Sequence, residues 1–87
     1  MDKAEARALA QASLATIASD GYGAAAEHVD TVHLDQVTAD SGTHYEMETS
    51  YLWKGEAHED ILVICRITSK HWFSHEHLEE SITLHTA

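Results

Sequence analysis

The stretch Ile61-Leu62-Val63-Ile64-Cys65 constrains the fold most strongly, because its five consecutive residues are all apolar. Successive side chains of a β-strand point to opposite faces of the sheet, so this stretch is apolar on both faces. A strand of that composition needs a cover on each side. We therefore predict a well-covered strand over residues 61–69, and the fold must supply something for each of its faces.

The segment before this strand, residues 43–53, alternates most clearly between apolar and polar side chains. A period of two with one apolar face predicts an antiparallel strand that is half buried. Residues 54–60 have the composition of a polar hairpin loop between the two strands. The predicted inward positions are Tyr45, Met47, Thr49, Tyr51 and Trp53.

Residues 28–38 predict a further strand, in which the apolar parity shifts between Leu34 and Val37. One extra residue in a strand produces such a shift, so the sequence predicts a β-bulge near Asp35-Gln36. The following residues, Asp40-Ser41-Gly42-Thr43, have the composition of a turn.

The last segment, residues 71–85, is predicted to return as the fourth strand, with four apolar side chains of one parity. A short helix over residues 76–82, capped by Ser74, competes with this interpretation because Glu79-Glu80 is poor strand sequence. The sequence leaves both alternatives open. The four apolar side chains are Trp72, Leu78, Ile82 and Leu84.

The N-terminal residues 2–19 predict a helix with an alanine-rich apolar stripe. Asp2 is a favourable N-cap, Glu5 completes a pattern like a capping box, and Gly21 suits a left-handed C-terminal cap. Residues 24–27 form either a short helical turn or a loop. The stripe consists of Ala6, Ala10, Ser13, Leu14, Ile17 and Ala18.

The elements together predict an α+β fold in a single domain, residues 1–87: an N-terminal helix packed on a four-stranded antiparallel curved sheet. The order α-β-β-β-β resembles that of cystatin-like folds, in order alone. One helix covers one face of the sheet, which leaves the second apolar face of residues 61–65 exposed. Exposed apolar patches usually mark interfaces, so we expect a homodimer or another protein partner on this face. Sheet curvature, a loop or residues 24–27 are the alternative covers.

Charge narrows the range of partners, because 15 acidic residues outnumber five Lys and Arg and give a formal net charge of −10. Binding to nucleic acid or anionic membranes relies on clusters of Lys and Arg, so neither is expected. A basic protein partner suits this charge, although acidic charge also simply keeps small proteins in solution. No apolar run reaches the ~20 residues that span a bilayer. With no signal-peptide pattern in residues 1–12, we expect a cytoplasmic protein.

Histidines provide the nearest approach to a chemical motif. In an extended chain His71, His75 and His77 share one face, and His75 with His77 is the pair most able to bind a metal ion. The remaining ligands would have to come from a neighbouring strand or a second copy. Solvated histidines on an exposed strand are the alternative. The eight histidines also admit a response to mildly acidic pH.

The remaining candidates are a buried thiol and a ligand pocket. Cys65 lies within the apolar stretch, which predicts an inert, structural cysteine. A pocket between helix and sheet is one interpretation of the aromatic positions, and a packed core is the other. No acid, base and nucleophile come together, so neither catalysis nor a cofactor is predicted. The sequence therefore favours an acidic protein-interaction module, with a small-molecule-binding domain as alternative. The pocket residues would be Tyr45, Met47, Thr49, Tyr51, Trp53 and Trp72.

Overall fold

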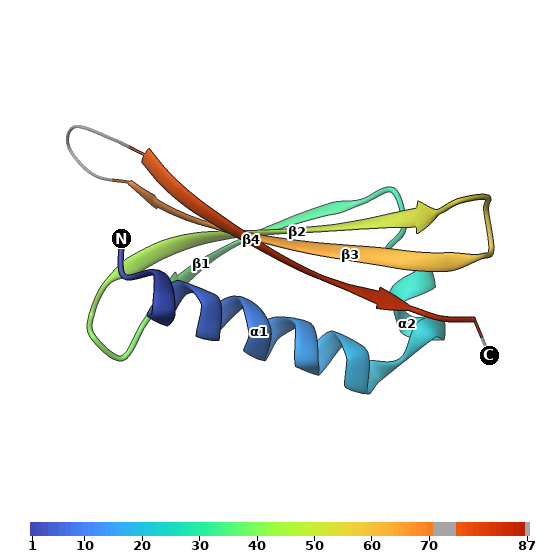
Figure 1. Cartoon of the computed structure of the whole chain (residues 1–87), viewed down its shortest axis with the longest axis horizontal. Helices are drawn as coiled ribbons and strands as arrows, with labels where there is room; N and C mark the ends of the chain where they lie inside the picture. The colour runs from blue at the N-terminus through green and yellow to red at the C-terminus, as the bar shows by residue number, and fades with distance from the viewer. Residues whose placement is uncertain (71–74, 87) are drawn as a thin grey trace.

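The structure is a computed structural model that describes residues 1–70 and 75–86. It confirms the predicted architecture: an N-terminal helix packed on an open four-stranded antiparallel sheet, with the strands in sequence order (Figure 1). The elements are α1 (Lys3–Asp20), α2 (Tyr22–Ala26), β1 (Val32–Thr38), β2 (His44–Lys54), β3 (Asp60–Lys70) and β4 (His75–Leu84).

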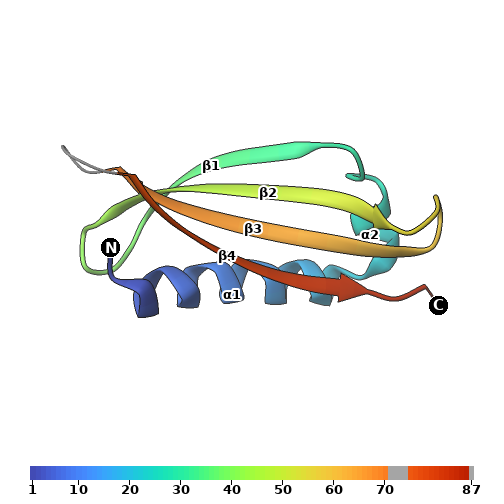
Figure 2. The ribbon, with the colours of Figure 1, turned by 45° about the horizontal axis from the view of Figure 1, so that its top comes forward.

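The helix α1 runs along one face of the twisted sheet and packs mainly against β3 and β4. In Figure 2, β1 lies on the side of the sheet that is farthest from α1. Of the two alternatives for residues 24–27, a helical turn or a loop, the structure shows the helical one: the short helix α2 follows Gly21 and contacts β3. We call the sheet face that α1 covers the inner face, and the opposite one the outer face.

The core forms where the alanine-rich stripe of α1 meets the inner face. Ala6, Ala10 and Leu14 of α1 are buried, and small side chains let the helix approach the strands closely. Ala18 is exposed instead of packed, so the predicted stripe was wrong at its C-terminal end. The inner positions of β3 are fully buried, at 0% exposure: Ile61, Val63, Cys65 and Ile67.

Asp2 caps the start of α1, as the sequence predicted, but the Glu5 side chain bonds to residues outside the helix. Asp2 caps the helix by accepting a hydrogen bond from the backbone N–H of Glu5 at 3.1 Å. The Glu5 carboxylate accepts from the Tyr45 hydroxyl at 2.8 Å and from the Ser41 hydroxyl at 3.0 Å. It therefore ties α1 to β2 and to the first hairpin. At the other end, Gly21 has φ +91°, and its N–H donates to the carbonyl of Ile17.

The predicted β-bulge near Asp35-Gln36 was wrong. Each residue of β1 faces one residue of β2, from Val32 opposite Ser50 to Thr38 opposite His44. The parity shift in the sequence has another cause, since β1 places Val32 and Leu34 on the outer face and Val37 on the inner one. The strand also begins later than predicted, because residues 28–31 form a turn.

Residues 76–82 form part of β4, so the alternative short helix was wrong. The two consecutive glutamates fit a strand because each finds a suitable face. Glu79 lies on the outer face opposite Arg66. Glu80 lies on the inner side, where it accepts from Gln11 at 3.3 Å and pairs with Arg7 at 3.4 Å. Contacts with α1 thus override the weak local strand preference.

Candidate interaction surface

The outer face carries an apolar cluster that neither helix of the described chain covers. Its members come from three neighbouring strands and include the three large hydrophobic side chains with the greatest described exposure: Val32 at 57%, Leu34 at 63% and Leu52 at 42%. Half-buried side chains of β3 continue the cluster between them. We call these residues the outer apolar cluster: Val32, Leu34, Leu52, Leu62 and Ile64.

The register aligns these side chains across the sheet. Val32 lies opposite Ser50, and Ser50 lies opposite Ile64, so the two apolar side chains flank a small hydroxyl. Leu52 lies directly opposite Leu62. Directly opposed side chains in an antiparallel sheet lie about 4.5–5.5 Å apart at Cβ, so the cluster is continuous across the strands.

A charged row borders the outer apolar cluster. Arg66 of β3 lies opposite Glu48 of β2 on one side and opposite Glu79 of β4 on the other. The Nε atom of Arg66 is buried and has no hydrogen-bond partner in the described parts of the chain. A buried donor that is left unpaired costs about 1–3 kcal/mol, so an acceptor brought by a partner would be favourable here.

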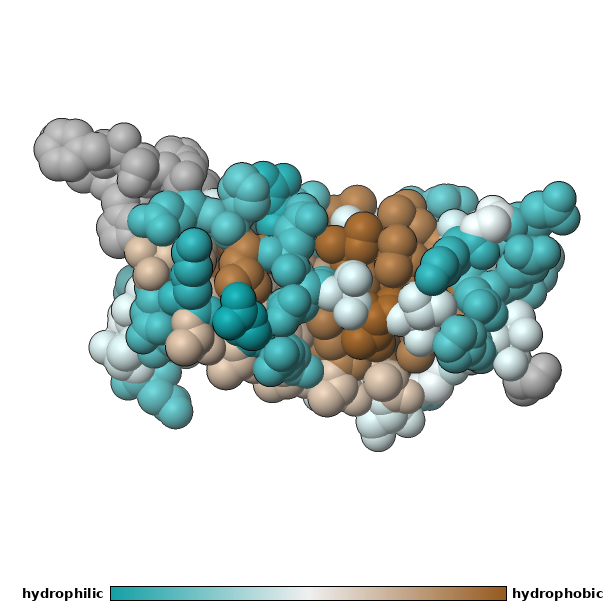
Figure 3. Space-filling model, in the orientation of Figure 1, coloured by the Kyte–Doolittle hydropathy of each residue, from teal (hydrophilic) through white to brown (hydrophobic). Residues whose placement is uncertain are grey.

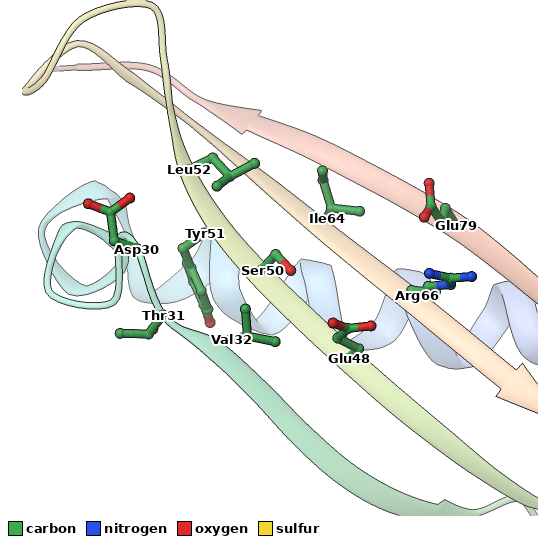
Figure 4. Close-up of a pocket in the computed structure, with 10 residues that line it drawn as sticks. All are labelled: Asp30, Thr31, Val32, Glu48, Ser50, Tyr51, Leu52, Ile64, Arg66 and Glu79. Atoms are coloured by element: carbon green, nitrogen blue, oxygen red, sulfur yellow. The ribbon is translucent and has the colours of Figure 1, made fainter.

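The charged row and part of the outer apolar cluster line an open hollow of about 370 Å³. Figure 4 looks onto it, with Val32, Leu52 and Ile64 around one part and Glu48, Arg66 and Glu79 at the other. Figure 3 views the molecule as Figure 1 does, with β4 in front of the other strands, and shows apolar surface in the middle and hydrophilic surface toward both ends. On the outer face, apolar side chains beside a charged row resemble the apolar centre and polar rim of a protein interface.

The predicted pocket residues lie on the inner face, where they fill the space beneath α1 and α2. Tyr45, Met47, Thr49 and Tyr51 are buried, and all but Thr49 belong to the apolar core cluster. Trp53 is half buried and packs against the ring of His58, with 5.2 Å between centroids. The sixth residue, Trp72, lies outside the described residues. The structure therefore brings the described ones together as a packed layer.

Cys65 occupies the centre of this layer, as predicted for a structural cysteine. Its burial raises the pKa of the thiol, and a hydrogen bond with Thr49 opposes that shift only in part. A thiol with a raised pKa is a weak nucleophile at neutral pH.

The predicted metal pair lies on β4. His77 pairs with Thr68 and is exposed on the outer face, and the backbone of His75 pairs with Lys70. His71 lies outside the described residues. Among the side chains that the structure describes, no group of three or more His, Cys, Asp or Glu is placed to hold a metal ion. The metal site therefore stays a prediction.

The sequence patterns did not predict one cluster of aromatic rings. His28, His33 and Tyr51 meet at the β1 side of the inner face, with the two imidazole centroids 4.9 Å apart. Burial raises the pKa of Tyr51, and the Asp20 carboxylate adds to the shift. The only signal was the alternation of residues 31–37, which would have placed His33 with Val37 had no bulge been assumed.

Comparison with protein families, curated proteins and solved structures gave no match. Among the helices of the described chain, none has the length and apolar character needed to cross a membrane.

Proposed function

We propose that this protein is a small acidic protein-interaction module, which self-associates through its sheet and offers its outer face to a basic protein. The uncovered outer apolar cluster is the observation that carries the proposal. Small monomeric domains seldom leave several large hydrophobic side chains together in water, and such patches generally serve as binding surfaces.

The charges around the cluster support a basic partner. Glu48 and Glu79 lie beside the apolar side chains, with Arg66 between them. The whole chain has a formal net charge of −10, so its long-range field attracts cationic proteins and repels polyanions. Lysine and arginine side chains of a partner would pair with the glutamates while its apolar side chains cover the cluster.

The packed inner face favours this function over the small-molecule-binding alternative. Tyr45, Met47 and Tyr51 would have to line such a pocket, and they fill the space between the helices and the sheet instead.

Sedimentation velocity at tens of micromolar protein tests the self-association, and titration with an amphipathic peptide of lysine and leucine tests the basic partner. We expect wild type to sediment as a dimer and to bind the peptide, with the affinity falling as salt rises. Leu52→Glu, on the middle strand of the outer apolar cluster, removes an apolar contact with the leucines of the peptide and should weaken binding by tenfold or more. Ala12→Glu adds the same charge at an exposed position of α1 and should leave binding unchanged.

A wild-type protein that remains a monomer and ignores the peptide contradicts the proposal. Equal effects of Leu52→Glu and Ala12→Glu would show that charge alone, and not the outer face, determines binding.

A further inference from the structure

The free edge of β1 is a second part of the sheet that lacks a partner among the described residues. Six of its seven residues are exposed, and only Val37 is half buried. Natural proteins protect such edges with prolines, lysines, inward-pointing charges, bulges or a covering element. β1 contains no proline or lysine and pairs with β2 without a bulge, and its single inward-pointing charge is that of Asp35. The opposite edge strand, β4, is instead tied to the N-terminal region by ion pairs of Glu76 and Glu80.

The first hairpin shows which backbone groups of β1 point outward. The N–H of Ala39 donates to the carbonyl of Thr43 at 2.9 Å, and the N–H of Gly42 donates to the carbonyl of Ala39 at 2.8 Å. Ala39 and Thr43 are therefore a hydrogen-bonded pair at the end of the ladder. Such pairs alternate along an antiparallel ladder, so His33, Asp35 and Val37 bond to β2. The N–H and C=O groups of the other residues face the free edge: Val32, Leu34, Gln36 and Thr38.

We propose that two copies of the protein join along this edge, β1 against β1 in antiparallel orientation, to form one continuous eight-stranded sheet. This inference rests on the self-association proposed above and specifies how it occurs. The two-fold axis passes at Leu34, which lies opposite the partner's Leu34. The pairs around the axis share about six backbone hydrogen bonds.

The side chains of β1 select this register. With Leu34 on the axis, His33 lies opposite the partner's Asp35, and the same contact repeats across the axis. An imidazole N–H can donate to that carboxylate, and a protonated imidazole forms an ion pair with it. A shift of the axis to Asp35 would place two carboxylates directly opposite each other. Like charges in directly opposed positions are destabilising. A shift of the axis to His33 would place the two imidazoles opposite each other and lose both contacts with Asp35.

The space beside β1 admits a second copy. α1 packs mainly against β3 and β4, so it lies away from the junction on the inner face (Figure 2). On the outer face, Leu34 meets the partner's Leu34, and Val32 lies opposite the partner's Gln36. The two outer apolar clusters then merge across the axis into one surface, which enlarges the site proposed for a basic partner.

Two variants at one position test the edge. Leu34→Pro removes an N–H that points outward, so the ladder with β2 keeps its hydrogen bonds. Leu34→Ala keeps this N–H and removes most of the side chain. In sedimentation velocity we expect Leu34→Pro to weaken dimerisation by at least tenfold and Leu34→Ala by no more than about threefold. Circular dichroism establishes that both variants are folded.

A charge exchange gives an independent test that does not depend on proline. Asp35→Lys should weaken the dimer, because the new ammonium faces the partner's His33. His33→Asp combined with Asp35→Lys recreates opposite charges across the axis and should restore dimerisation. In wild type, amide hydrogen exchange at Val32, Leu34 and Gln36 should slow as the protein concentration rises.

The outcomes separate this inference from the proposed function. A wild-type monomer at tens of micromolar overturns both the edge pairing and the proposed self-association. A dimer that survives Leu34→Pro and Asp35→Lys but not Leu52→Glu overturns the edge pairing alone, since the copies would then meet through their outer faces.

Discussion

The two faces of β3 have similar side chains but different surroundings. Ile61, Val63 and Ile67 point to the inner face and are fully buried. Leu62 and Ile64 lie between them in sequence, point to the outer face and remain half exposed. Helix α1 covers the first set, and no element of the described chain covers the second.

The difference shows that apolar sequence alone does not determine burial. The helix α1 has one apolar stripe, and this stripe packs against the inner face. The outer face keeps the same composition without the same cover. Exposed apolar faces of this kind often mark interaction sites, which is the basis of the function proposed above, and the stability of the domain depends on the other face.

The largest change in stability is expected when side chains of β3 are truncated to alanine, on one face and then on the other. Ile67→Ala creates a cavity at a fully buried position and should reduce the free energy of unfolding by about 2–5 kcal/mol. Ile64→Ala removes the same atoms on the outer face and should reduce it by less than half as much. Urea denaturation measures both. Equal losses would show that the outer face is as well packed as the inner one.

A smaller effect is expected where α1 touches the inner face. Ala10 is fully buried, so Ala10→Leu forces the helix away from the strands and should cost about 1–3 kcal/mol of stability. Ala12→Leu on the exposed side of the same helix should change stability by no more than about 0.5 kcal/mol. If Ala10→Leu were tolerated equally well, close packing of α1 would not be the reason for the alanine stripe.

Removing the hydroxyl of Tyr45 tests the hydrogen bond that links α1 to the inner face. Tyr45→Phe removes the 2.8 Å hydrogen bond to Glu5 and should cost about 0.5–1.5 kcal/mol. Burial, followed by the hydrogen bond to Glu5, raises the pKa of Tyr45 from 10.0 to about 12. The unfolded chain therefore loses this proton first, and the contribution of Tyr45 is lost as pH rises from about 10 to about 12.

Denaturation at a series of alkaline pH values checks this prediction. Stability should fall less steeply in Tyr45→Phe than in wild type across that interval. A parallel fall in the two proteins would mean that the Tyr45 hydroxyl is as exposed to water as in the unfolded chain.

The smallest effect is expected at the polar end of the outer face. Asp60 accepts from the ring of His85 at 3.0 Å and from the N–H of Thr86 at 3.2 Å. These two hydrogen bonds, His85 first, lower the pKa of Asp60 below 3.8. The stabilisation is thus present above pH 3.8 and is lost as pH falls through the lowered pKa.

Asp60→Asn should therefore lower the melting temperature slightly at neutral pH and leave it unchanged at strongly acidic pH. The groups are exposed to solvent, which limits the effect. A decrease as large as that of Tyr45→Phe would show that this end of the sheet matters as much as the contact of α1 with the inner face.

Sequence patterns predicted the helix, the four strands and the inward residues of β2, because each has a strong local period. These patterns failed at Asp35-Gln36, where the parity shift predicts a bulge that β1 does not have. A bulge and a strand with apolar residues on both faces give the same pattern, and only the pairing with β2 separates them. The same patterns could not decide between strand and helix for β4. Glu80 fits the strand through its contacts with Arg7 and Gln11, and these residues are too distant in sequence for a local pattern to include them.

The candidate surface was foreseen only in part. The second apolar face of residues 61–65 pointed to an interface, but Val32, Leu34 and Leu52 could not be assigned to it without the strand order. The five pocket residues predicted on β2 do share the inner face, and the structure shows that they pack together beneath the helices, while Trp72 lies outside the described residues.

Local period and composition are enough to predict the N-terminal helix, the strands β1 to β3, the acidic charge and the excess of apolar side chains over what one helix can cover. The tertiary structure was needed to show that β4 is a strand, which strand is left at the bare edge, which side chains join Ile64 on the outer face and which groups hold α1 in place. Those features depend on register and on contacts between residues far apart in the chain, and no local pattern encodes them.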